Sequence, residues 1–210
     1  MGSGDSIRTG APALTALGMP VPDSTVAQRA EALIADVAPA FLVNHSVRAY
    51  AWAVELAWHD KLEFDPEILY VSALLHDIGL VPAYDLGGCF EIDGAIAAER
   101  FATAEGQPST RARAIYDVIA LHMEEELPPD RASEVVLLWD STGVDVSGDR
   151  LDDVRPELVP DVLAAYPRLD FKIGFAAAFA DQATLKPSCR AAEMVAEGML
   201  QAIADAPFES

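Results

Sequence analysis

Residues 70–80 read Tyr-Val-Ser-Ala-Leu-Leu-His-Asp-Ile-Gly-Leu, an apolar run interrupted by an adjacent histidine and aspartate, His76 and Asp77. The apolar residues predict a buried helix, and Gly79 predicts its end, since glycine is common just past a helix C-terminus. Two buried polar groups need partners, and a metal ion could bind both, because imidazole nitrogen and carboxylate oxygen are common metal ligands. For the dipeptide alone, a hydrogen-bonded core histidine beside a solvated aspartate is the favoured interpretation.

Three further polar residues lie in comparable contexts. His45 lies about one helix upstream, in Asn-His-Ser-Val-Arg-Ala-Tyr. His122 ends the apolar run Val-Ile-Ala-Leu-His, and Asp145 lies in Gly-Val-Asp-Val-Ser-Gly at the end of another predicted helix. Together with His76 and Asp77, these residues favour one shared site over isolated polar groups.

The order of a histidine, a His-Asp pair and a distant aspartate, each on its own helix, resembles the HD metallohydrolase superfamily. Four short segments resemble its cyanamide-hydratase-type branch in particular: residues 44–50, 73–80, 90–95 (Phe-Glu-Ile-Asp-Gly-Ala) and 166–168 (Tyr-Pro-Arg). The resemblance spans roughly residues 40–175. It implies an all-α, single-domain helical bundle of the HD type.

The resemblance also implies one divalent transition metal with four protein ligands: His45, His76, Asp77 and Asp145. Zinc is the first choice, and iron, manganese and nickel stay open, because geometry and availability decide among them. Such a metal lowers the pKa of a bound water, to ~7 in favourable zinc sites. His122 is assigned to substrate binding or proton transfer, since a single extra histidine is too few for the second metal of the two-metal HD enzymes. A histidine that is merely hydrogen-bonded at a helix end is an equally good interpretation of His122.

Two competitors for these positions are set aside. His59 and Asp60 form a second His-Asp pair, but it runs into a polar, proline-ended stretch, and His59 would lie ~21 Å along the helix from His45. We expect His59 on the surface. Asp140 is five residues before Asp145, about 140° away around a helix, so only one of the two can face the metal. The motif context favours Asp145.

The roles of other polar residues near the motifs stay open. Arg48 either forms an intramolecular salt bridge, which is slightly favoured, or meets an anionic substrate. Glu91 and Asp93 either close over the site or cap a helix N-terminus, where acidic side chains are common. For Lys172 a surface position is the default expectation.

The composition limits the partners. The 210 residues carry a formal net charge of −20, with only 14 lysines and arginines. This argues against nucleic acids and anionic membranes, which both require basic residues. The two cysteines, Cys89 and Cys189, make no disulfide framework, and no signal peptide or membrane-spanning run is apparent. We therefore expect a cytoplasmic protein that acts on a small molecule, and a homo-oligomer is left open.

The chain is expected to form one domain over residues 23–210, preceded by an irregular arm over residues 1–22. Proline, glycine and capping residues divide the domain into helices. No segment predicts a confident strand. The helices are expected at about residues 24–37, 40–59, 66–77, 91–105, 109–122, 132–146, 156–165, 170–186 and 190–204.

Three functions are weighed. The first is a hydratase that adds metal-activated water to a small neutral nitrile-like molecule, as in the conversion of cyanamide to urea. The second is a phosphohydrolase acting on a nucleotide or other small phosphate ester, although phosphate sites usually recruit more arginine and lysine. The third, a non-catalytic metal-binding protein, would have a filled and closed site.

Overall fold

In the computed structural model, which describes residues 11–209, the chain is built from helices, and none of these residues forms a strand. The predicted all-α fold is therefore confirmed. Three short 3-10 helices join the α-helices: η1 (Ile78–Leu80), η2 (Pro82–Tyr84) and η3 (Leu151–Asp153). The α-helices are α1 (Ala11–Ala16), α2 (Thr25–Val37), α3 (Ala40–Asp60), α4 (Pro66–Leu75), α5 (Phe90–Ala104), α6 (Ser109–Ala120), α7 (Ser133–Val146), α8 (Leu158–Ala165), α9 (Phe171–Leu185), α10 (Arg190–Ala196) and α11 (Met199–Asp205).

The helix starts follow local sequence signals. Ser24 caps α2, its hydroxyl oxygen accepting a hydrogen bond from the backbone N–H of Ala27. Pro39 precedes α3, and Pro66 is the first residue of α4, where its missing N–H costs nothing. The carboxylate of Asp65 accepts from two backbone N–H groups in the first turn of α4. These local signals explain why most boundaries could be predicted within a few residues.

Part of the predicted irregular N-terminal arm is helical. Residues 11–16 form α1, and the side chains of Leu14 and Met19 are buried in the main core. The hydroxyl of Tyr50 on α3 also donates to the carbonyl of Pro20. This segment is held by contacts with α3, which is distant in sequence. The glycines and prolines of the segment itself could not predict those contacts. Residues 1–10 of the predicted arm lie outside the described residues.

The last predicted helix is two helices. The backbone of Gly198 has a φ of 104°, a left-handed conformation that glycine adopts without steric cost, and it separates α10 from α11. The chain turns there, so both short helices can pack against α9.

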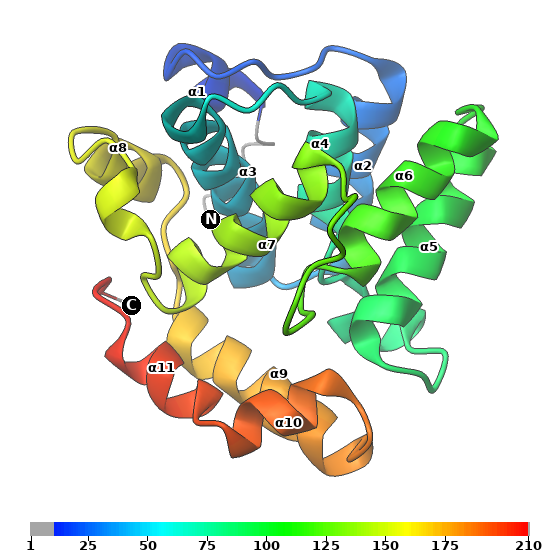
Figure 1. Cartoon of the computed structure of the whole chain (residues 1–210), viewed down its shortest axis with the longest axis vertical. Coiled ribbons are helices and arrows are strands. Elements are labelled where there is room, and N and C mark those ends of the chain that lie inside the picture. Colours follow the sequence, from blue (N-terminus) through cyan, green and yellow to red (C-terminus); the bar gives the residue numbers. More distant parts are fainter. Residues whose placement is uncertain (1–10, 210) are drawn as a thin grey trace, which may run out of the picture.

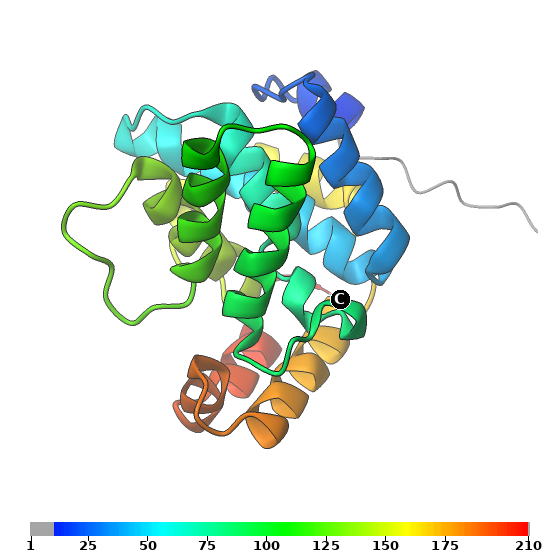
Figure 2. The same cartoon turned by 90° about the vertical axis from the view of Figure 1, so that its right-hand side faces the viewer.

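The helices form two apolar clusters that meet near α3. The main core lies among α2 to α7, with α3 buried along most of its length. A smaller cluster includes Phe90, Phe171, Phe175 and Phe179 and is covered by α9 to α11. In both Figure 1 and Figure 2 these three helices lie together at one end of the molecule, below the bundle formed by the others.

Cys89 and Cys189 form a disulfide that joins the N-termini of α5 and α10. This single bond was not predicted from the sequence, from which only the absence of a disulfide framework was expected. The cysteines are 100 residues apart, and isolated cysteines carry no spacing signal for pairing. Only the packing of the C-terminal helices under α5 brings them together.

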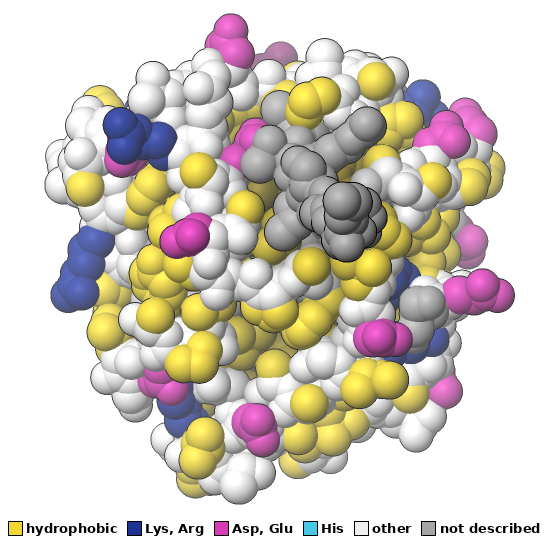
Figure 3. All heavy atoms as spheres, turned by 180° about the vertical axis from the view of Figure 1, so that it is seen from behind, with side chains coloured by type: hydrophobic (Ala, Val, Ile, Leu, Met, Phe, Trp, Pro, Cys, Tyr) yellow, Lys and Arg dark blue, Asp and Glu magenta, His cyan; other side chains and the backbone are white. Residues whose placement is uncertain are grey.

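On the face seen from behind, hydrophobic side chains occupy much of the centre, and acidic and basic side chains lie scattered among them (Figure 3). Among the described helices, none has the length and hydropathy needed to cross a membrane.

Candidate metal centre

Three of the predicted metal ligands lie together where the main core meets the smaller apolar cluster. His45 lies in the second turn of α3, His76 immediately follows α4, and Asp77 precedes η1. Each side chain is at least 98% buried. One donor atom from each residue lies within 4.8 Å of the others, the only group of this kind among residues 11–209.

Gly79 fixes the position of the His-Asp pair relative to α5. A Cβ atom at Gly79 would lie 2.0 Å from the carbonyl oxygen of Phe90 and 2.9 Å from the backbone nitrogen of Gly94. Any side chain there would therefore clash with backbone. Glycine lets η1 lie directly against the first turns of α5, and so sets where His76 and Asp77 point.

Hydrogen bonds fix the orientation of the two imidazole rings. His76 Nδ1 lies 2.8 Å from the carbonyl oxygen of Ala73, and His45 Nδ1 lies 2.7 Å from Oδ2 of Asp145. Because these oxygens can only accept, each Nδ1 carries the hydrogen, and in the neutral ring each Nε2 keeps a lone pair. Those two Nε2 atoms are 3.1 Å apart.

The nitrogen and oxygen atoms of these three side chains are arranged to bind a cation. Oδ2 of Asp77 lies 3.1 Å from Nε2 of His76 and 3.4 Å from Nε2 of His45, yet it is buried without a hydrogen-bond partner. Burial lowers the pKa of His45, but Asp145 and Asp77 outweigh it, so the net shift is upward and reflects local demand for positive charge. A divalent metal satisfies two facing lone pairs and an unpaired carboxylate together, and the nitrogen and oxygen donors suit the transition metals expected from the sequence.

Asp145 lies on the Nδ1 side of His45, and its carboxylate already accepts several hydrogen bonds. Arg48 donates to both carboxylate oxygens, from Nε to Oδ1 at 2.8 Å and from Nη2 to Oδ2 at 2.7 Å. Burial alone would raise the pKa of Asp145, but Arg48 and His45 hold it well below its usual value. Carboxylates often hold a metal-binding histidine in this way, fixing its tautomer. Direct coordination by Asp145 stays a prediction.

Two residues that the sequence did not assign also contact Asp145. Trp52 Nε1 donates to its Oδ1 at 2.9 Å, and Arg168 Nη1 donates to its backbone carbonyl at 3.1 Å. Trp52 lies two helical turns after His45 and therefore on the same face of α3. Arg168 belongs to the Tyr-Pro-Arg segment that contributed to the family resemblance, but that segment did not indicate which residue Arg168 contacts.

Neither of the rejected competitors belongs to the group of three metal-binding residues. His59 is half exposed and pairs with Asp60 at 2.9 Å, which confirms its surface position. Asp140 accepts a hydrogen bond from Arg150 at 2.6 Å and lies outside the group of three donors. Burial raises the pKa of Asp140 despite that partner.

His122 follows α6 and faces the cluster. Its Nδ1 donates to the carbonyl of Ile119 at 2.5 Å, so Nε2 keeps a lone pair, and Nε2 lies 3.8 Å from Oδ1 of Asp77. Burial lowers the pKa of His122 to about 4. The bond to Ile119 is the contact expected of a histidine at a helix end, and a role of His122 in substrate binding or proton transfer stays a prediction.

Of the remaining polar residues, Arg48, Asp93 and Lys172 make structural contacts, whereas Glu91 has an unpaired oxygen. Arg48 forms the salt bridge that the sequence favoured. Asp93 accepts hydrogen bonds from the backbone N–H groups of Leu86 and Gly88, holding the loop before α5. Glu91 is buried with Oε2 unpaired, and Lys172 donates to two carbonyls at the end of α11.

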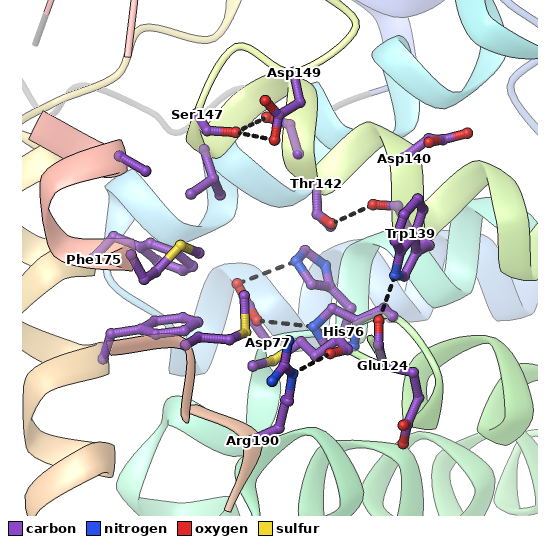
Figure 4. Close-up of a pocket in the computed structure, with 18 of the residues that line it drawn as sticks. His76, Asp77, Glu124, Trp139, Asp140, Thr142, Ser147, Asp149, Phe175 and Arg190 are labelled. Carbon is purple, nitrogen blue, oxygen red and sulfur yellow. Dashed lines mark hydrogen bonds and ion pairs between the residues drawn. The ribbon is translucent and has the colours of Figure 1, made fainter. Parts of the chain in front are cut away.

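A cavity of about 520 Å³ opens from the donor cluster and is lined by His45, His76, Asp77 and His122 on one side. Figure 4 shows His76 and Asp77 between Phe175 of α9 and Trp139 of α7. Residues of α10 and α11 complete the wall. No motif in the sequence indicated that these C-terminal helices contribute to the site.

Comparison with known proteins agrees with this geometry. Residues 42–145 match the HD domain family, and this segment contains all four predicted ligands. The chain belongs to the HD superfamily, and the protein is an enzyme of the metal-dependent hydrolase and hydratase class. Over 178 residues it is 25% identical to two cyanamide hydratases, DDI2 and DDI3 of Saccharomyces cerevisiae (strain ATCC 204508 / S288c). The match covers 80% of this chain and 77% of each relative, which confirms the predicted similarity to the cyanamide-hydratase-like branch.

Proposed function

We propose that the protein is a hydratase that adds water to the nitrile carbon of a small neutral substrate. The observation that carries the proposal is the unsatisfied donor cluster of His45, His76 and Asp77 on the wall of an open cavity. The similarity to two cyanamide hydratases supports the reaction type. The open cavity also speaks against a purely structural metal site, which would be closed.

His45, His76 and Asp77 would hold one divalent metal, with zinc as the proposed metal. Asp145 stays the proposed fourth ligand, although in this structure its Oδ2 lies at Nδ1 of His45, on the other side of that ring from Nε2. When bound, the metal supplies Lewis acidity and lowers the pKa of a coordinated water. Asp145 and the carbonyl of Ala73 keep both imidazoles in the tautomer whose Nε2 can coordinate.

His122 is the proposed proton-transfer residue. Hydration of a nitrile to an amide joins the water oxygen to carbon, and both hydrogens of that water end on the former nitrile nitrogen, so a nearby group must accept a proton and return it. With Nδ1–H bound to Ile119, the free lone pair of His122 is on Nε2, which faces Asp77 and the cavity. General acid-base groups of this kind contribute ~10²–10⁴-fold to rate.

The charges on the cavity wall favour a neutral substrate over a phosphate ester. Arg150 donates to Asp140, Asp60 and Asp153, and Arg190 is paired with Glu193. Both lining arginines are thus engaged by carboxylates, whereas phosphate sites direct such groups at the ligand. A phosphohydrolase is the alternative that the experiment must exclude.

The test joins metal analysis to two substrate panels. Purified protein should contain about one equivalent of transition metal and convert cyanamide to urea, with little release of phosphate from p-nitrophenyl phosphate or nucleoside monophosphates. Asp77→Ala should lose the metal and the activity, while His59→Ala should keep both. Phosphate release without urea formation would replace the proposal with the phosphohydrolase.

We also propose that the protein has no nucleic-acid or membrane partner, on the ground of its net charge of −20, and that it is cytoplasmic, as the low cysteine count suggested. The disulfide weighs against this location, because such bonds are rare in the cytosol. Thiol labelling in intact cells would test the location, and size-exclusion chromatography would test for a homo-oligomer.

A further inference from the structure

The cavity is far larger than cyanamide requires. A molecule of three non-hydrogen atoms fills on the order of 90 Å³, taking about 30 Å³ per atom as for liquid water. The cavity of about 520 Å³ would therefore leave cyanamide loosely held. Its volume lies in the range of ~300–1,000 Å³ that is typical of sites for larger organic ligands.

The part of the wall opposite α7 is apolar and partly aromatic. Phe175 and Phe179 of α9 line it, with ring centroids 4.9 Å apart. Met194 of α10 and Met199 of α11 lie beside them. Thioethers and ring edges adapt well to a flat aromatic guest.

The polar groups on the α7 side are already occupied by the protein. The hydroxyl of Thr142 donates to the carbonyl of Trp139, and that of Ser147 lies within hydrogen-bond distance of two acceptors, the Gly143 carbonyl and the Asp149 carboxylate. Arg190, the first residue of α10, is engaged in the same way, since it donates to the carbonyl of Met123 and to Glu193. These engaged groups would add little to the binding of a sugar, a phosphate or a carboxylate, and the exposed acids Glu124 and Glu125, which also line the cavity, would repel the last two.

We propose that the preferred substrate is a nitrile carried on a compact aromatic or branched apolar group, on the order of ten non-hydrogen atoms in all. The nitrile lies at His122 and the donor cluster, and its substituent lies among Phe175, Met194 and Met199. This inference rests on the proposed hydratase function for the reaction and on the cavity for the choice of substrate.

The test compares benzonitrile with cyanamide in a matched pair of variants. Ala202 of α11 lines the cavity, whereas Ala204, two residues later on the same helix, is exposed. Ala202→Phe places a benzyl group in the cavity, and Ala204→Phe makes the same change in solvent. Turnover is measured as benzamide and urea formation, and binding of benzonitrile is measured separately by ligand-observed NMR.

We expect a kcat/KM for benzonitrile at least tenfold above that for cyanamide. Ala202→Phe should lower the benzonitrile value at least tenfold and weaken its binding, with cyanamide turnover changed less than threefold, and Ala204→Phe should resemble the unmodified protein. Cyanamide turnover with neither binding nor turnover of benzonitrile would overturn this inference and leave the hydratase proposal intact. Binding of benzonitrile that Ala202→Phe weakens, without hydration of any nitrile, would sustain the apolar ligand and defeat the hydratase.

Discussion

Replacing Asp145 by alanine should destabilise the metal-free protein by several kcal/mol, beyond any effect on metal binding. Asp145 and Arg48 are both fully buried and joined by two hydrogen bonds, and Trp52 and His45 donate to the same carboxylate. Removing one partner of a buried ion pair leaves the other charge unpaired and costs about 3–5 kcal/mol. For a chain of this length each kcal/mol lowers Tm by about 2–4 °C, so a fall of roughly 6–20 °C is expected.

The assay is thermal denaturation of protein stripped of metal with a chelator, so that lost coordination cannot contribute. Asp140→Ala is the matched control, because it removes an aspartate from the same helix whose partner, Arg150, is partly exposed, and such pairs contribute ~1 kcal/mol or less. If Asp145→Ala melts within about 3 °C of the unmodified metal-free protein, the buried network does not anchor α7 to α3, and the reasoning is wrong.

The other predictions concern single residues. His76→Ala should abolish metal binding, measured by elemental analysis, whereas His59→Ala should leave it unchanged; full occupancy in the His76 variant would exclude that residue as a ligand. His122→Ala should keep the metal and lower kcat by ~10²–10⁴-fold, and loss of metal would make His122 a ligand instead. Cys189→Ser should lower the free energy of unfolding by about 2–4 kcal/mol in denaturant titrations, since the cross-link closes a loop of about 100 residues. An unchanged denaturation midpoint under non-reducing conditions would mean that the disulfide does not form.

Much of the fold could be predicted because its signals are local. Pro66 starts α4 and the apolar residues of α4 predict its burial, so the position of the His-Asp pair at its end followed directly. The break at Gly198 could not be predicted with the same ease, because a glycine within a helical pattern is tolerated unless tertiary packing draws the chain aside.

The site was predicted only in part, because its motifs are visible in the sequence whereas its long-range contacts are not. The resemblance pointed to His45, His76 and Asp77, and the structure places these three together. It could not show that Asp145 is held by Arg48, because that contact joins residues 97 positions apart. The wall formed by α9 to α11 lies outside the segment that matches the HD family and had no motif of its own.

The close approach at Gly79 has a consequence for how this protein can vary. A survey of tolerated substitutions would find position 79 as restricted as its neighbours His76 and Asp77, although glycine donates to no metal and touches no substrate. Even alanine would place its methyl group against the Phe90 carbonyl, and the backbone could yield only by moving α5. Position 79 is thus constrained by shape alone. If position 79 and the cavity-lining positions were randomised and active variants selected, glycine should return at position 79 more consistently than the original residues return at most lining positions.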